Sequence, residues 1–127
     1  MATPSMESTK SATATDCLFC KIVAKQLPAS VVYEDGTVTA FRDISPQLPV
    51  HVLVVPNEHV ATTAELEPRH DALVGAVLRA AALVARNEGV AASGYRIVVN
   101  TGADALNSVP HLHAHVLGGR RMGWPPG

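Results

Sequence analysis

Three histidines alternate with apolar residues near the C-terminal end of the chain, in the segment His111-Leu112-His113-Ala114-His115. A period of two residues is that of an extended strand, on which successive side chains point to opposite faces. The pattern therefore predicts a β-strand that carries three imidazoles on one face. Because the ordinary pKa of imidazole lies close to neutrality, such a row suits nucleophilic attack, proton transfer or metal binding. The pattern alone leaves both a metal site and a catalytic strand open.

The rest of the sequence predicts an α+β domain built on an antiparallel sheet. Asp35-Gly36 separates two β-rich runs, and such a pair supplies the positive φ angles of a two-residue hairpin turn. Apolar residues recur at three- and four-residue steps over 69–88, which predicts one long helix. The predicted elements are a short helix or turn over 17–23, strands over 31–34, 37–41, 51–55 and 95–100, the long helix, and the histidine strand.

Composition narrows the class of protein. A length of 127 residues suits one domain, and residues 1–15, mostly Ser, Thr and Ala, predict a disordered tail before a domain over 16–127. A formal net charge of −1 argues against an electrostatically driven nucleic-acid binder. No apolar run approaches the roughly 18 residues that a membrane span needs, and the tail lacks the apolar block of a signal peptide. We therefore expect a cytoplasmic protein without nucleic-acid or membrane partners.

The histidine segment and its surroundings resemble a known family. Residues 108–120, Ser-Val-Pro-His-Leu-His-Ala-His-Val-Leu-Gly-Gly-Arg, resemble the signature of the histidine triad (HIT) superfamily of nucleotide hydrolases and transferases. The Gly-Gly-Arg and the final Trp-Pro-Pro-Gly narrow the resemblance to the histidine triad nucleotide-binding (Hint) branch, as do residues 41–47, residues 51–56 and His59. The resemblance implies a five-stranded antiparallel sheet with one long and one short helix. It also implies a homodimer in which Trp124 reaches the partner's site.

The resemblance assigns roles to the triad and its neighbours. It implies that His113 attacks the α-phosphorus of a nucleotide and forms a covalent nucleotidyl-imidazole, which water then hydrolyses. Attack through one ring nitrogen requires an acceptor for the other N–H, and we expect a backbone carbonyl of the neighbouring loop. His115 would contact a phosphate oxygen or pass a proton to the leaving group, and Ser108 and Asn100 would bind the phosphate or leaving group.

The resemblance also outlines a nucleoside pocket. Asp43 matches the family acid that accepts hydrogen bonds from both ribose hydroxyls, which favours ribonucleotides. A pocket with few polar partners for the base should discriminate poorly between adenine and guanine. The apolar positions that match the walls around the base, and that could equally belong to the core, are Phe19, Ile22, Phe41, Ile44 and Leu53.

The segment Cys17-Leu18-Phe19-Cys20 is a second candidate site. In a cytosolic chain such a pair is more often metal-binding or redox-active than a structural disulfide. Some HIT relatives complete a zinc site with two histidines, here His59 and His111, so a structural Zn²⁺ is our hypothesis, with no cofactor needed for the chemistry. The alternative is a pair of reduced, buried thiols. Without zinc, His111 would join a hydrogen-bond relay with His51, a further candidate catalytic residue.

Some residues depart from the family pattern. Leu106 replaces a glycine, so the loop before the triad is expected to differ in backbone angles or in its approach to the phosphate. Asn107 is one methylene shorter than the usual glutamine, and Arg42 stands near the ribose where a histidine is common. These changes leave the nucleophile in place and bear on rate or preferred substrate.

The function that the sequence predicts is that of a purine nucleoside phosphoramidase, which cleaves the P–N bond of AMP- or GMP-amine conjugates such as nucleotidyl-lysine. A dinucleoside polyphosphate hydrolase would use the same nucleophile on a P–O bond. A nucleotidyl transferase is disfavoured because its typical triad ends in glutamine, where this chain has His115. A nucleotide- and zinc-binding regulatory or scaffold protein is the alternative from a different class.

Overall fold

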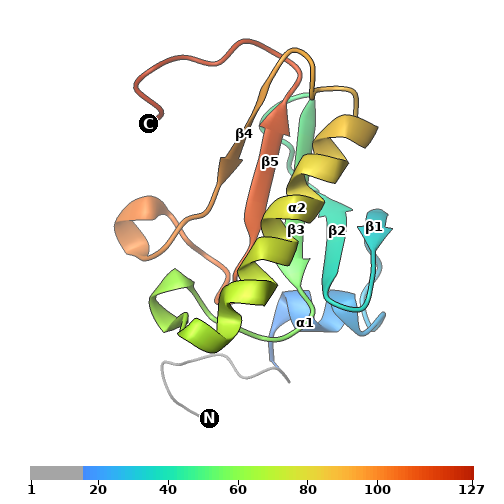
Figure 1. Cartoon of the computed structure of the whole chain (residues 1–127), viewed down its shortest axis with the longest axis vertical. Helices are drawn as coiled ribbons and strands as arrows, with labels where there is room; N and C mark the ends of the chain where they lie inside the picture. The colour runs from blue at the N-terminus through green and yellow to red at the C-terminus, as the bar shows by residue number, and fades with distance from the viewer. Residues whose placement is uncertain (1–15) are drawn as a thin grey trace.

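The computed structural model describes residues 16–127, so the predicted disordered tail over 1–15 lies outside the described residues. The predicted α+β class is confirmed, with a five-stranded sheet, one short helix and one long helix (Figure 1). In chain order the helices and strands are α1 (Leu18–Val23), β1 (Val31–Glu34), β2 (Val38–Arg42), β3 (Val50–Pro56), α2 (Asp71–Asn87), β4 (Tyr95–Val98) and β5 (Ala114–Gly118). Short 3₁₀ turns lie at Thr63–Glu65, Pro68–His70 and Ala103–Ala105.

The last strand lies inside the sheet. The strand order is β1-β2-β3-β5-β4, and every neighbouring pair is antiparallel. In the β3–β5 register, Leu53 lies opposite His115 and His51 lies opposite Leu117. Because alternate residues share a face, His51 and His115 lie on the same face of the sheet, one diagonal step apart.

The two helices cover opposite faces of the sheet. Under α2, small and β-branched side chains pack closely, and this core includes Val52, Val54, Ala81, Val84, Ala114 and Val116. On the other face α1 covers a second buried cluster of Cys17, Phe19, Ile22, Phe41, Leu53 and Val55. The strand residues of the two clusters alternate in sequence, which is the period of two expected for a sheet buried on both faces. The candidate site lies on the α1 face.

The histidine strand is shorter than predicted. β5 begins at Ala114, so His115 is the only triad member within it, and the prediction of one strand carrying all three is wrong. A tight turn after Pro110 precedes the strand: the His111 N–H donates to the Val109 carbonyl (2.9 Å), and the Leu112 N–H donates to the Val60 carbonyl (2.6 Å). The His113 and His115 rings still lie side by side, with centroids 5.0 Å apart, and the Phe19 ring lies 5.1 Å from His113 and 6.0 Å from His111 between ring centroids.

The β1–β2 turn also differs from its prediction. Gly36 does not have a positive φ, so the two-residue turn with positive φ angles at Asp35-Gly36 is wrong. The Asp35 carboxylate instead accepts the N–H groups of Thr37 and Val38, at 2.8 and 2.9 Å. An aspartate side chain that caps its own turn in this way replaces the backbone geometry of the shorter hairpin.

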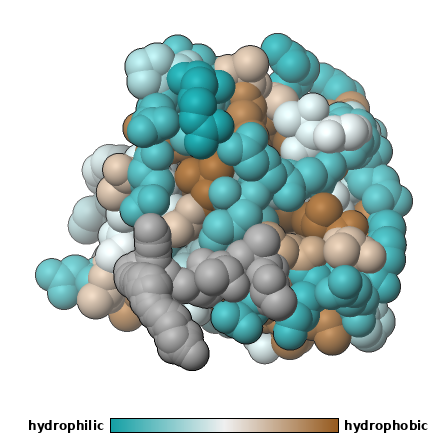
Figure 2. Space-filling view, turned by 90° about the horizontal axis from the view of Figure 1, so that it is seen from below, coloured by the Kyte–Doolittle hydropathy of each residue, from teal (hydrophilic) through white to brown (hydrophobic). Residues whose placement is uncertain are grey.

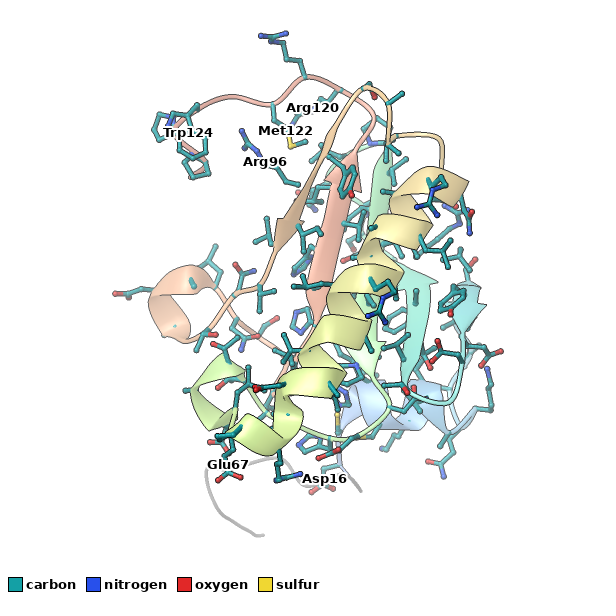
Figure 3. All side chains as sticks on the ribbon, in the orientation of Figure 1. Asp16, Glu67, Arg96, Arg120, Met122 and Trp124 are labelled. Atoms are coloured by element: carbon teal, nitrogen blue, oxygen red, sulfur yellow. The ribbon has the colours of Figure 1, made fainter. Side chains whose placement is uncertain are left out.

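The C-terminal segment runs away from β5 and ends beside β4. Trp124 is 82% exposed, and the Arg96 guanidinium lies 5.7 Å from its ring centroid (Figure 3). An Arg96 N–H donates to the Gly123 carbonyl. Seen from the α1 end, hydrophilic residues cover most of the surface and hydrophobic ones show only between them (Figure 2). Within residues 16–127, no helix combines the length and apolar character needed to cross a membrane.

The turn after β5 depends on a glycine. Gly119 has a φ of +99°, and a Cβ added there would lie 2.8 Å from the Pro49 Cβ, in a ring that cannot rotate away. We expect Gly119→Ala to lower the free energy of unfolding by about 2 kcal/mol or more, measured by urea denaturation. Gly36→Ala is the matched control, because no atom lies within 4 Å of its added Cβ. Equal effects of the two substitutions would contradict this account.

Candidate active site

His113 is held with one ring nitrogen engaged and the other free for attack. Its Nδ1–H donates to the His111 carbonyl oxygen at 2.7 Å, so the lone pair of the neutral ring lies on Nε2. The expectation of a backbone carbonyl as the acceptor is confirmed, and the carbonyl belongs to the first triad histidine. The side chain is 7% exposed, and this burial lowers the pKa of His113 although the bond to the His111 carbonyl opposes the shift. A neutral imidazole is the nucleophilic form.

His51 and His115 form a hydrogen-bonded pair with a defined direction. The Gln47 main-chain N–H donates to His51 Nδ1 at 3.0 Å, so the proton of neutral His51 is on Nε2. That Nε2–H donates to His115 Nδ1 at 2.9 Å, which leaves the proton of His115 on its own Nε2. Burial, with repulsion from His113 and His51, lowers the pKa of His115 to about 4. His115 is therefore a neutral ring that presents an N–H donor.

The structure corrects the partner expected for His51. His111 was the expected relay partner in the absence of zinc, but the contact of His51 is with His115. The β3–β5 register places these two on one face, whereas the turn after Pro110 directs His111 toward α1. Gln47 was missed altogether, because its contribution is a main-chain N–H that no side-chain pattern indicates.

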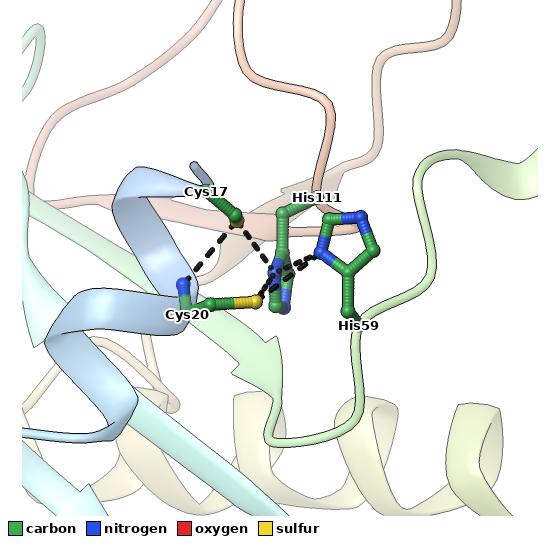
Figure 4. A group of neighbouring side chains, drawn as sticks. All are labelled: Cys17, Cys20, His59 and His111. Carbon is green, nitrogen blue, oxygen red and sulfur yellow. Dashed lines mark hydrogen bonds between the residues drawn. The ribbon is translucent and has the colours of Figure 1, made fainter. Parts of the chain in front are cut away.

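Cys17, Cys20, His59 and His111 come together beside α1 (Figure 4). Their ligand atoms all lie within 4.8 Å of one another. The two Nδ1 atoms are 3.3 Å apart, and the sulfur-to-Nδ1 distances are 3.2 Å for Cys17–His111, 3.2 Å for Cys20–His59 and 3.4 Å for Cys20–His111. Tetrahedral Zn²⁺ with two nitrogen and two sulfur ligands places neighbouring donor atoms about 3.3–3.8 Å apart. The measured spacings of 3.2–3.4 Å lie at or just below the short end of this range, and two thiols with two imidazoles are a common zinc donor set, so the cluster fits zinc.

Neighbouring groups orient the donor atoms of this cluster and shift the pKa values of its thiols. The His111 Nε2–H donates to the Pro56 carbonyl at 2.9 Å, so its Nδ1 lone pair faces the sulfurs. Cys17 caps the start of α1 by accepting the Cys20 N–H at 3.3 Å. Burial alone would raise the pKa of the Cys17 thiol, but hydrogen bonds to His111 and His59 lower it to about 5. Burial and the adjacent Cys17 sulfur raise the pKa of Cys20 to about 12.

Asp43 lies at the end of β2, next to His51. Its N–H donates to the His51 carbonyl at 3.0 Å, its Oδ1 accepts the Ser45 N–H at 2.7 Å, and its Oδ2 is 3.4 Å from His51 Nε2. Asp43, His51 and His115 have the spacing of a metal site. The Gln47 N–H on His51 Nδ1 argues against one, because it leaves the proton on the nitrogen that would have to bind the metal.

The predicted nucleoside-pocket positions divide into two groups. Four of them are buried in the cluster under α1, namely Phe19, Ile22, Phe41 and Leu53. Ile44 is 97% exposed and lies outside that cluster. The Phe19 ring meets the His113 ring edge-on, so this cluster extends to the candidate nucleophile.

The loop before the triad keeps an unusual backbone. Leu106 has φ +63° and ψ +32°, in the left-handed region that glycine tolerates best, and its side chain is 83% exposed. The loop folds back through the Asn107 N–H, which donates to the Gly102 carbonyl at 3.1 Å. Ser108 is exposed on this loop, and Asn100 is half-buried just after β4. Leu106 therefore adopts a backbone conformation that glycine tolerates best.

Residues 24–122 match the HIT domain family, and the chain belongs to that family. A 14 kDa zinc-binding protein of Brassica juncea is 48% identical, covering 88% of this chain and 100% of the relative. The purine nucleoside phosphoramidase of Escherichia coli K12 is 42% identical (87% and 92%), and adenylylsulfatase HINT1 of Arabidopsis thaliana is 48% identical (87% and 76%).

Solved structures of HIT proteins also match this chain. A HIT family hydrolase from Legionella pneumophila superposes with a TM-score of 0.86 at 45% identity, covering 87% of this chain and 99% of that one. A Zn-bound histidine triad family protein from Mycobacterium smegmatis has a TM-score of 0.72 at 32% identity (91% and 82%). The chain is a HIT protein of the Hint type, with nucleotide hydrolases among its relatives.

The cost in stability of the positive φ at Leu106 can be measured by substitution. An exposed leucine at positive φ loses little burial when it is removed, so Leu106→Gly should raise the free energy of unfolding by about 1 kcal/mol. Leu106→Ala keeps a Cβ in the same conformation and should not stabilise. Chemical denaturation of the three proteins measures the difference. A Leu106→Gly protein less stable than Leu106→Ala would show that this conformation carries no strain.

Proposed function

We propose that this protein is a purine nucleoside phosphoramidase that hydrolyses the P–N bond of AMP- or GMP-amine conjugates through a covalent nucleotidyl-histidine. The observation that carries the proposal is the His113 ring, whose Nδ1–H is bound to the His111 carbonyl while burial lowers its pKa. Those features favour a neutral Nε2 nucleophile at neutral pH. The relative from Escherichia coli named as a purine nucleoside phosphoramidase supports the same substrate class.

In the proposed reaction, His113 Nε2 forms a bond to the α-phosphorus as the bond from phosphorus to the amine nitrogen breaks. The amine leaves with a proton. Water then attacks the phosphorus and breaks its bond to Nε2, one proton of the water returns to the group that protonated the amine, and the nucleoside monophosphate is released. The Nε2–H of His115 would contact a phosphoryl oxygen or supply the proton of the amine. Asn100 and Ser108 would bind the phosphate, and Asp43 would hold the ribose.

A second substrate class is favoured by the Arabidopsis relative, which is named an adenylylsulfatase. A nucleotidyl sulfate presents the same α-phosphorus to His113, with sulfate leaving in place of an amine. Sulfate needs no proton to depart, so this reaction would depend less on His115. The ratio of the two activities in a His115→Ala variant therefore separates the two substrate classes.

We also propose that Cys17, Cys20, His59 and His111 hold a structural Zn²⁺, supported by their spacing and by the names of the Brassica and Mycobacterium relatives. Bound there, the ion would cross-link α1 to the segments after β3 and before β5.

We further propose a homodimer, supported by the exposed Trp124 and the free edge of β4. We also propose a cytoplasmic location, in keeping with two free cysteines.

The nucleophile is tested first. His113→Ala should abolish turnover of a fluorogenic adenosine phosphoramidate while leaving AMP affinity largely intact, because the other phosphate and ribose contacts remain. His70→Asn is the matched control: His70 lies at the start of α2, where its Nδ1 accepts the Glu67 N–H, and asparagine can accept the same bond. More than a few per cent of wild-type turnover in His113→Ala would rule out the mechanism. AMP binding without turnover by the wild type would favour a regulatory or scaffold protein.

The metal is tested by composition and stability. We expect one zinc ion per chain by elemental analysis, and its loss in Cys17→Ser and Cys20→Ser. At free zinc about 1,000 times the dissociation constant, the ion adds about 4 kcal/mol to the free energy of unfolding, so chelation should lower the melting temperature. Glu58→Gln, next to His59 in sequence but outside the cluster, should keep the metal. Metal-free wild type whose melting is unchanged by added zinc would favour reduced, buried thiols.

A further inference from the structure

The loop between β2 and β3 surrounds the ring of His51. From one end of the loop, the Gln47 N–H donates to His51 Nδ1 at 3.0 Å. From the other end, Asp43 binds the His51 carbonyl through its N–H at 3.0 Å and places Oδ2 3.4 Å from His51 Nε2. Both nitrogens of the His51 ring therefore face groups of the loop that carries Asp43, the residue to which the family resemblance assigns ribose binding.

The proton on His51 Nε2 lies between two acceptors. His115 Nδ1 is at 2.9 Å, and the Asp43 Oδ2 is at 3.4 Å. Asp43 cannot turn away freely, because its other oxygen accepts the Ser45 N–H at 2.7 Å. Any ligand hydroxyl that donates to this carboxylate weakens its attraction for the His51 proton, and the His51–His115 hydrogen bond strengthens in consequence.

We propose that Asp43 is a positioning residue through which binding of the ribose diol orders the His51–His115 pair, so that the 2′- and 3′-hydroxyls control the chemical step as well as affinity. The inference rests on the proposed function. A 2′,3′-diol on Asp43 directs the His51 proton to His115 Nδ1 and thereby keeps the His115 proton on Nε2, toward the phosphate. A 2′-deoxynucleotide leaves that proton shared.

The charges around the pair give the direction of a pH effect. Burial lowers the pKa of His51 and the Asp43 carboxylate opposes the shift. For His115, burial and the nearby His113 and His51 lower the pKa, and Asp43 is again the opposing charge. Removing that carboxylate should lower the pKa of the pair further, and the acid limb of the pH–rate profile should move to lower pH.

Asp43→Asn tests the coupling with little change of shape, because the amide oxygen can still accept the Ser45 N–H. Asp35→Asn is the matched control, since Asp35 also accepts main-chain N–H groups in a turn, and its other partner is the hydroxyl of Tyr33. Histidine NMR titration without substrate should show a lower pKa for the His51–His115 pair in Asp43→Asn and no change in Asp35→Asn.

Substrate kinetics supply the second readout. For the wild type, a 2′-deoxyadenosine phosphoramidate should have a kcat at least fivefold below that of its ribose counterpart, in addition to any change in KM. In Asp43→Asn the two kcat values should converge. A deoxy effect confined to KM, together with an unchanged titration in Asp43→Asn, would overturn the coupling and leave Asp43 as a ribose contact alone.

The two proposals fail in different ways. If the wild type hydrolysed no phosphoramidate, the proposed function would fail, and the titration would be repeated with AMP and 2′-deoxy-AMP as ligands. AMP should then give the lower pKa of the pair, because both ligands carry the same phosphate and differ only in the hydroxyl offered to Asp43. Identical titrations with the two ligands would overturn the coupling by itself.

Discussion

The hydrogen bond from His113 Nδ1–H to the His111 carbonyl is the contact on which the site depends. It fixes the tautomer of His113, and it does so through a residue whose own ring lies in the thiol–imidazole cluster. One residue therefore serves two centres, with its main chain directed to the candidate nucleophile and its side chain to the candidate metal site. Phe19 joins the same two centres from α1, through edge-on contacts with both rings. A rigid cluster therefore also holds the His113 ring in place, because His111 belongs to the cluster and binds His113.

The two faces of the sheet bury different kinds of side chain. Beneath α2, valines and alanines form the larger of the two buried apolar clusters. On the opposite face the buried groups include imidazoles and thiols, each of which needs a hydrogen-bond partner to offset its burial. Main-chain groups of Gln47, Pro56 and His111 each engage one ring nitrogen and so fix the tautomers of His51, His111 and His113, while the other contacts join one side chain to another.

Side-chain periodicity predicted much of the fold, because it depends only on which residues are apolar and how they are spaced. The five strands, the long helix and the meeting of four candidate zinc ligands all follow from it or from the family resemblance. Features decided by backbone geometry were not predictable in the same way. The Asp35 cap replaced the expected turn, and the bend after Pro110 shortened the histidine strand. The partner of His51 depended on the strand register, which pairs residues more than sixty positions apart.

The strand order has a consequence for how the chain acquires its structure during synthesis. β5 is the last strand along the chain, yet it lies between β3 and β4. Until it emerges from the ribosome, β3 keeps one open edge and β4 has no strand beside it. During that time the contacts of His51 with His115 and of the two cysteines with His111 cannot form. The nascent chain must therefore bring together segments that are distant in sequence at a late stage, which is a slow step for a protein of this size. Strand edges that are exposed during that interval can pair with strands of other chains, so the incomplete chain is open to aggregation.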